Sequence, residues 1–463
     1  MIFASQQFIF LFAPIAYLAY WLLPYRFRMH WLLVASYFFY GWWDWRFCFL
    51  MLFSTLVDYL VGMWIPRAST HGRQRLLMLL SIAVNIGLLG FFKYAGFFGR
   101  SVNAVLAYFQ AGGEFPVLDI ALPIGISFYT FQSLSYTMDI YRGEVKPTKS
   151  FLHFAAFVSL FPQLVAGPVV RFSQLDSQLK NLPLRLSSSH LNLGLVFFSV
   201  GLVKKTLIAD RVAYFNSQLW ADFAHLSPGE AWIAVLGSAV QWYFDFAGYS
   251  LMAVGLGYLL GMRLPQNFNS PYRADDISDF WHKWHISLSS WLKDYLYIFL
   301  GGRKAHWRWF ALIGTMFLGG LWHGAAWTFV IFGLLHGFFL LMHHGLRYLG
   351  IKWRGGWCGR IGTMLLFALS LVVFVSPDMP SALRMYAHLV DFGSYLDPVH
   401  NVVLYYLLLA TGLLWAICLP NLYSWVEEQR GQPRPWALAA LGCLAALAVL
   451  FLSDTSPFLY YQF

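Results

Sequence analysis

Long apolar segments separated by short basic clusters run along this chain, and they constrain its fold more than any other feature. The segment FIFLFAPIAYLAYWLLP at 8–24, for example, is followed by the cluster YRFRMH at 25–30. A helix of about 20 apolar residues spans the hydrocarbon of a bilayer, and clusters of Lys and Arg are typical of cytoplasmic loops. With 59% hydrophobic and only 11% charged residues, the chain does not suit a single water-soluble core. We therefore predict an all-α polytopic integral membrane protein in contact with membrane lipid.

The charge and the cysteines argue against several other classes. The formal net charge of +10 comes from short clusters between apolar segments, so it indicates membrane topology and no nucleic-acid partner. The four cysteines form no C-x-x-C pair, and neither H-E-x-x-H nor G-x-S-x-G occurs. We expect no metal site, no bound cofactor and no self-contained serine hydrolase mechanism.

Two apolar stretches are too short or too interrupted for ordinary spans. The stretch 151–170 is broken by Pro162, Gly167 and Pro168, which is consistent with a re-entrant hairpin or a pair of half-helices. The stretch 309–346 fits two passes into 38 residues, with His323 near the turn between them. Irregular backbone at membrane depth is tolerated where it lines an enclosed cavity. We therefore expect a cavity in the middle of the protein.

The polar stretch DFWHKWHISLSSWLKDYLYIFLGGRK at 279–304 reads as one amphipathic helix at the membrane interface. At about 100° per residue, its apolar face contains Trp281, Trp284, Leu288, Trp291, Leu292 and Tyr295. The opposite face contains Asp279, Lys283, Ser287, Ser290, Lys293 and Asp294. His285 lies at the edge of the apolar face and is expected to point inwards, whereas His282 leans towards the polar side. An alternative is that the helix is only an anchor and His285 a hydrogen-bonded packing residue.

His323 is an ionisable residue expected inside the membrane, where such side chains suggest a functional site. Imidazole can take a proton from a hydroxyl near neutral pH. The alternative is a histidine satisfied by backbone carbonyls, and His336, His343 and His344 weaken any argument from histidine alone.

At these residues the chain resembles the membrane-bound O-acyltransferase (MBOAT) family, in particular its bacterial polysaccharide O-acetyltransferase branch. The similarity lies in FWHKWHISLSSWLKDYLYIFLGG at 280–302 and GGLWHGAAWTFVIFGLLHG at 319–337, with further similar blocks at 122–143, 161–175 and 242–272. The resemblance implies one MBOAT membrane domain over 1–463, with N-terminal helices at 1–115, a catalytic core at 116–346 and C-terminal helices at 347–463. It further implies about 11 transmembrane helices plus re-entrant or interfacial helices around a central tunnel. One position departs from the pattern: Leu251 stands where the branch commonly has Asp.

The resemblance also implies roles for individual residues. His323 and His285 match the family's two catalytic positions, His323 as general base, polarising group or acyl acceptor and His285 on the donor side. The residues predicted to line the tunnel or substrate are Trp322, Trp327, Trp281, Trp284 and Ser287, although membrane aromatics are more often packing residues. Possible contacts of the CoA phosphates are Lys283, Lys293, Arg303 and Lys304, although anchoring at the cytoplasmic face would also place them there.

The function expected from the resemblance is O-acetyl transfer from cytoplasmic acetyl-CoA across the bacterial inner membrane to an exported exopolysaccharide such as alginate or cellulose. A periplasmic, serine hydrolase-like acetyltransferase is the expected partner. Two alternatives stay open: a D-alanyl or longer-chain acyl transferase acting on teichoic acid, lipid or protein, and a transporter whose histidines relay protons. The acceptor glycan, the acyl length and the oligomeric state are not specified by the sequence.

Overall fold

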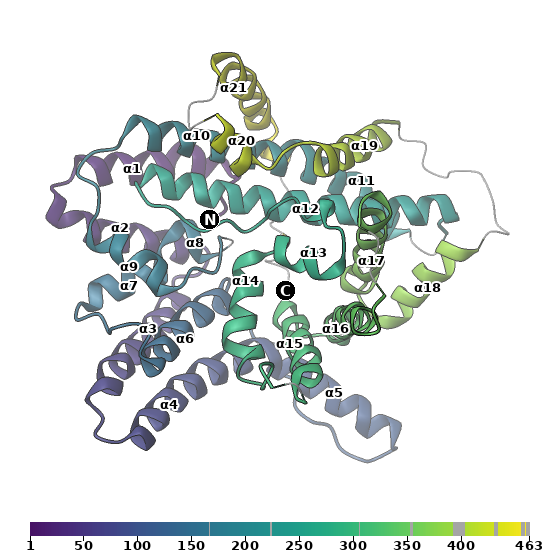
Figure 1. Cartoon of the computed structure of the whole chain (residues 1–463), viewed down its shortest axis with the longest axis horizontal. Helices are drawn as coiled ribbons and strands as arrows, with labels where there is room; N and C mark the ends of the chain where they lie inside the picture. The colour runs from purple at the N-terminus through teal and green to yellow at the C-terminus, as the bar shows by residue number, and fades with distance from the viewer. Residues whose placement is uncertain are drawn as a thin grey trace. The chain divides into compact units, whose positions relative to one another are not determined.

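The structure is a computed structural model that describes residues 1–165, 167–222, 225–304, 306–351, 355–391, 403–429, 434–454 and 459. Throughout these residues the regular structure is helical, and they contain no β-strand (Figure 1). The predicted all-α class is therefore confirmed. The chain divides into two compact units: Met1 with residues 10–187 and 259–264, and residues 2–9 with 188–258 and 265–463. The predicted single MBOAT domain, with N-terminal helices at 1–115, a catalytic core at 116–346 and C-terminal helices at 347–463, stays a prediction.

The first unit contains nine α-helices among its described residues. They are α1 (Ala13–Leu22), α2 (Tyr25–Gly41), α3 (Arg46–Trp64), α4 (His71–Leu89), α5 (Ala95–Tyr108), α6 (Ile126–Arg142), α7 (Phe151–Ser159), α8 (Phe161–Leu164) and α9 (Phe172–Lys180). The break between α7 and α8, just before Pro162, confirms the predicted interruption of the stretch 151–170. Its re-entrant path stays a prediction.

A buried polar cluster joins α3, α4 and α6. The carboxylate of Asp58 on α3 accepts hydrogen bonds from the Ser81 hydroxyl at 2.6 Å and the Asn85 amide at 2.9 Å, both on α4. The Ser81 hydroxyl also lies 3.0 Å from Thr137 Oγ1 on α6. Polar side chains in an apolar environment stabilise helix association when they satisfy one another. This cluster therefore fixes how the three helices pack.

The second unit carries both predicted catalytic histidines. Its α-helices are α10 (Ser188–Val203), α11 (Asp210–Ala221), α12 (Pro228–Leu259), α13 (Ile277–Lys283), α14 (Ile286–Trp291), α15 (Arg308–His323), α16 (Trp327–Tyr348), α17 (Trp357–Val375), α18 (Met379–Val390), α19 (Val403–Cys418), α20 (Leu422–Glu428) and α21 (Pro435–Leu450). A π-helical turn, Lys204–Ala209, joins α10 to α11. In α12 every residue from 242 to 257 is buried, so this helix is the core of the unit.

Helices α15 and α16 pack closely because glycines meet at their contact. A Cβ atom added to Gly320 would overlap with the carbonyl oxygen of Phe329, and one added to Gly333 would overlap with that of Met316. Small residues allow such close approach of two backbones. The predicted turn at His323 is confirmed, since α15 ends at this residue and α16 begins at Trp327.

Five helical segments among the described residues are long and apolar enough to cross a membrane. They are Arg46–Arg67, His71–Tyr108, Ser188–Ala221, Trp327–Tyr348 and Trp357–Val375. The pair α19 and α20, bent by 53°, would make a sixth. These segments support a multi-pass membrane protein. The predicted count of about 11 spans is not confirmed, because other apolar helices, such as α21 with its 16 residues, are shorter than a full span.

Candidate active site

The stretch 279–304 is not the single continuous helix that the sequence predicted. Helix α13 ends at Lys283, and α14 begins at Ile286 after a change of direction (Figure 1). Between them His285 has a left-handed backbone, with φ 44° and ψ 52°. A non-glycine residue rarely adopts this conformation unless the surrounding structure enforces it. The helical wheel is therefore wrong beyond Lys283, and Ser287, predicted on the polar face, is buried.

The break places the His285 side chain in the interior of the second unit. His285 is fully buried, as its inward orientation predicted, whereas His282 is exposed, as predicted. The ring of His285 packs edge-on against Phe246, with 4.6 Å between centroids. Its Nδ1 lies 3.1 Å from Asn267 Oδ1.

Asn267 determines which nitrogen of His285 carries the proton. Its Oδ1 also accepts hydrogen bonds from the Ser287 hydroxyl at 2.8 Å and the Ser287 backbone N–H at 3.3 Å, so this atom is an acceptor. Nδ1 of His285 therefore donates, and Nε2 keeps its lone pair in the neutral ring. Burial lowers the pKa of His285 well below its usual range, and the neighbouring His323 lowers this pKa further. The ring is thus held neutral with Nε2 as a proton acceptor.

Asn267 was missed by reasoning from the sequence. Its backbone carbonyl accepts from Ile286 N at 2.9 Å, and its amide donates to Ser250 Oγ on α12 at 3.1 Å. The backbone carbonyl and the side-chain amide of Asn267 therefore together hold the 285–287 turn against α12. The available signal was its place in QNFNSPY, within the similar block 242–272.

His323 lies close to His285, and the ring of Trp322 contacts both histidines. The Trp322 ring centroid is 5.9 Å from that of His285 and 5.1 Å from that of His323. His323 is 7% exposed and also contacts Phe374, at 5.3 Å between centroids. The structure thus brings together two imidazoles that are 38 positions apart in sequence (323 minus 285), in surroundings that exclude most water.

Comparison with known proteins shows which family has this sequence pattern. Residues 144–350 match the family model of MBOAT, the membrane-bound O-acyltransferase family. "Probable alginate O-acetylase AlgI" of Pseudomonas putida is 39% identical over 100% of both chains, and the protein of that name in Pseudomonas aeruginosa is 42% identical over 85% of this chain and 76% of its own. "Peptidoglycan O-acetyltransferase" of Helicobacter pylori is 33% identical over 100% of this chain and 98% of its own. This chain belongs to the membrane-bound O-acyltransferase family.

The resemblance predicted from the motifs is therefore confirmed, and this MBOAT protein is an acyltransferase. Both histidines of the predicted pair, with Trp322, lie inside the segment 144–350 that matches the family. Within the described residues no group of three or more His, Cys, Asp or Glu side chains is arranged to hold a metal ion.

The other tryptophans predicted to line the tunnel of this acyltransferase are more dispersed. Trp284 is buried and stacks on Phe280, with 5.5 Å between centroids. Trp281 is half-buried and its ring lies 5.1 Å from His336. Trp327 is 58% exposed at the start of α16. Trp322 contacts both histidines, and the tunnel-lining role of all four tryptophans stays a prediction.

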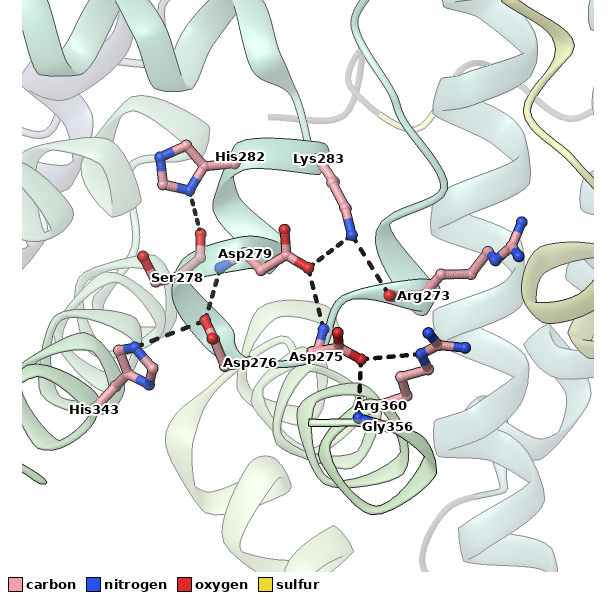
Figure 2. Close-up of polar contacts among 10 residues, drawn as sticks. All are labelled: Arg273, Asp275, Asp276, Ser278, Asp279, His282, Lys283, His343, Gly356 and Arg360. Atoms are coloured by element: carbon pink, nitrogen blue, oxygen red, sulfur yellow. Dashed lines mark hydrogen bonds and ion pairs between the residues drawn. The ribbon is translucent and has the colours of Figure 1, made fainter. Parts of the chain in front are cut away.

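The basic residues predicted to contact CoA fall into two groups. Lys293, Arg303 and Lys304 are exposed. Lys283 is half-buried, and its ammonium donates to Asp279 at 2.7 Å (Figure 2). An exposed cation is available for a phosphate, whereas Lys283 already has a carboxylate partner.

The charged residues around the start of α13 hold the helix that leads into His285. Asp276 caps α13 by accepting from Asp279 N at 2.8 Å, and His343 of α16 lies 3.8 Å from the same carboxylate (Figure 2). Arg360 of α17 donates to Asp275 at 3.0 Å and holds the pKa of that carboxyl below its usual range. An N-cap of this kind stabilises a helix by about 1 kcal/mol. These contacts tie α13 to α16 and α17.

Proposed function

We propose that this acyltransferase takes an acetyl group from cytoplasmic acetyl-CoA and delivers it across the membrane for O-acetylation of an exported polysaccharide. The observation that carries the proposal is the buried pair His285 and His323 around Trp322. The relatives that match this chain along its whole length are named as O-acetyltransferases of alginate or peptidoglycan. Alginate, cellulose or a similar glycan is therefore the acceptor class that we favour.

The two histidines have different catalytic roles in this proposal. The attacking hydroxyl oxygen bonds to the thioester carbonyl carbon while His323 takes the hydroxyl proton. The carbon–sulfur bond then breaks, and the departing thiolate receives that proton to give free CoA. His285, whose Nε2 is an acceptor, orients the donor side or relays the proton. The apolar surroundings keep water from hydrolysing the thioester.

The hydroxyl that receives the acetyl group belongs, in this proposal, to a separate periplasmic partner. We favour a serine hydrolase-like acetyltransferase at the bacterial inner membrane, because this chain has no G-x-S-x-G motif of its own. The partner then passes the acetyl group to the glycan.

Of the alternatives, membership of an acyltransferase family favours catalysis over a transporter. A D-alanyl or longer-chain cargo predicts a different donor preference. Competition between acetyl-CoA, butyryl-CoA and palmitoyl-CoA tests this directly: the proposal predicts that acetyl-CoA is used preferentially, and faster use of a long chain would favour the alternative.

Substitution of His323 tests the proposed chemistry. Purified protein is given labelled acetyl-CoA and a hydroxyl acceptor, and CoA release and label transfer are measured. We expect His323→Ala to lower both by at least about 100-fold, the range of general base catalysis. The matched control is His282→Ala, which removes an exposed histidine of the same stretch and is expected to keep wild-type activity. Wild-type turnover by folded His323→Ala would contradict the proposal.

A further inference from the structure

Lys204 is a buried lysine that the proposed chemistry does not use. It begins the π-helical turn Lys204–Ala209, inside the apolar segment Ser188–Ala221, and is 8% exposed. Its ammonium lies 5.7 Å from the ring centroids of Tyr243, Phe244 and Trp415, near the outer limit of a cation–π contact. It makes no hydrogen bond or ion pair with any residue that the structure describes.

The neighbouring lysine takes the carboxylates of this region. Lys205 Nζ lies 2.8 Å from Asp210 Oδ1 and 2.5 Å from Asp245 Oδ1, and all three side chains are buried. Lys205 therefore has two anionic partners, while Lys204 has none in the part of the chain that the structure describes. A buried cation without an anion is costly, and within a membrane protein it indicates a functional site.

Lys204 lines a cavity of about 20 Å³ in the second unit, which is room for one or two water-sized groups. Its polar lining includes Ser250, Asn267 and Ser270, and among the described residues that line it Lys204 is the only charged one. Leu251, the position that departs from the family pattern, also lines it. The cavity thus combines one ammonium with neutral polar groups, which suits the oxygen atoms of an anionic group at the end of a larger ligand.

The cavity and the His285 site have one residue in common, Asn267. Asn267, which fixes the proton on His285, is part of the cavity lining. Ser250 Oγ accepts the amide hydrogen of Asn267, so its own hydroxyl hydrogen is available to donate into the cavity. An anion bound at Lys204 would therefore lie one residue away from the candidate catalytic histidine.

We propose that the Lys204 cavity receives one or two terminal oxygens of a phosphate group, which pair with the Lys204 ammonium beside Ser250 and Asn267. This inference deepens the proposed function, on which it rests. The acyl donor and a phospholipid headgroup are the two sources of such a phosphate, and the experiment separates them.

The donor source is tested with two thioesters that differ by one phosphate group, S-acetyl-4′-phosphopantetheine and S-acetylpantetheine, and the full-length protein in vesicles. We expect the wild type to have a KM about tenfold lower for the phosphorylated thioester, the effect of one such contact. Lys204→Gln should raise the KM for S-acetyl-4′-phosphopantetheine to that of S-acetylpantetheine without changing kcat, and Lys204→Arg should restore part of the difference. Lys180→Gln, which removes an exposed lysine on α9, is the matched control.

The lipid source is tested by comparing vesicles of phosphatidylglycerol with vesicles of a phosphate-free glycolipid. The phosphate in the cavity is that of a lipid if two results are found together. First, Lys204→Gln leaves the donor preference unchanged. Second, Lys204→Gln and the phosphate-free lipid each lower activity by the same factor, and combining them lowers it no further. If neither the donor nor the lipid distinguishes Lys204→Gln from the wild type, the proposal is overturned.

Leu251→Asp provides a second variant, since it supplies Lys204 with a carboxylate from within the chain. We expect it to weaken phosphate recognition as much as Lys204→Gln does, and Leu251→Asn to weaken it much less. Equal effects of Leu251→Asp and Leu251→Asn would contradict the proposal.

A binding measurement on the wild type tests the donor source without any variant. Phosphopantetheine should raise the thermal unfolding temperature at about tenfold lower concentration than pantetheine. This binding test also works without turnover, so its failure is distinguishable from failure of the proposed reaction.

Discussion

His285 shows, at the scale of one residue, how this site depends on its supports. Its left-handed backbone is held by Asn267, which contacts the side chain of His285 and the backbone of the two residues that follow. The sequence predicted that His285 points inwards, and the family pattern predicted its pairing with His323. Asn267 could not be predicted, because the helical wheel assumed a continuous helix and a residue 18 positions away has no fixed relation to it.

Removal of the Asn267 side chain is expected to impair catalysis. In Asn267→Ala the Nδ1–H of His285 loses its acceptor, the ring is free to change tautomer and orientation, and kcat should fall roughly 10- to 100-fold. Ser290→Ala, on the same helix as Ser287, is the control. Steady-state turnover of acetyl-CoA measures the effect, and an unchanged kcat in Asn267→Ala would mean that the hydrogen bond does not position His285.

The burial of neutral His285 predicts a pH dependence of stability. Its pKa is lowered in the folded protein relative to the usual 6.5, so the unfolded chain binds a proton that the folded chain does not. Stability should therefore fall as pH decreases below 6.5, by up to about 1.4 kcal/mol per pH unit for one group. Thermal unfolding in detergent at pH 7.5 and 5.5, values about one unit either side of that pKa, measures this. His285→Gln should show a smaller loss on acidification, and an equal loss would contradict the interpretation.

At the scale of elements, the site is built from interrupted helices. The α13–α14 break exposes His285 to the interior, and the α15–α16 turn places His323 beside it. Irregular backbone at 309–346 was predictable, because two passes had to fit into 38 residues. The break at His285 was not, because nothing in FWHKWHISLSSW departs from the helical pattern of apolar residues. It arises from hydrogen bonds to Asn267, which are tertiary contacts.

The close packing of α15 on α16 predicts a sensitive glycine. In Gly333→Ala the new methyl group would overlap with the backbone carbonyl of Met316, which cannot move aside as a side chain could. We expect a loss of about 1–3 kcal/mol in the free energy of unfolding. Gly345→Ala in the same helix has nothing within 4 Å of the added atom and is the control. Equal unfolding temperatures for the two variants would show that α15 and α16 do not pack this closely.

For the whole molecule, hydropathy predicted the class of protein but not the number of membrane spans. The apolar segments and basic clusters identified a multi-pass helical membrane protein. They did not give the number of spans, because hydropathy does not record where a helix bends, breaks or ends short of a full crossing, as α7, α8 and α19 do. Polar groups also lie inside the described helices, and Asp58 and Lys205 are buried because each has partners within its own unit.

In the proposed reaction an acetyl group enters from one side of the membrane and leaves on the other. Sealed vesicles of one orientation, with labelled acetyl-CoA outside and a hydroxyl acceptor inside, test it most directly. With the cytoplasmic face outwards, we predict that CoA is released outside while label accumulates on the internal acceptor, and that His323→Ala abolishes both. Label that stays on the side of CoA release, or acetyl-CoA that enters intact, would contradict transfer across the membrane.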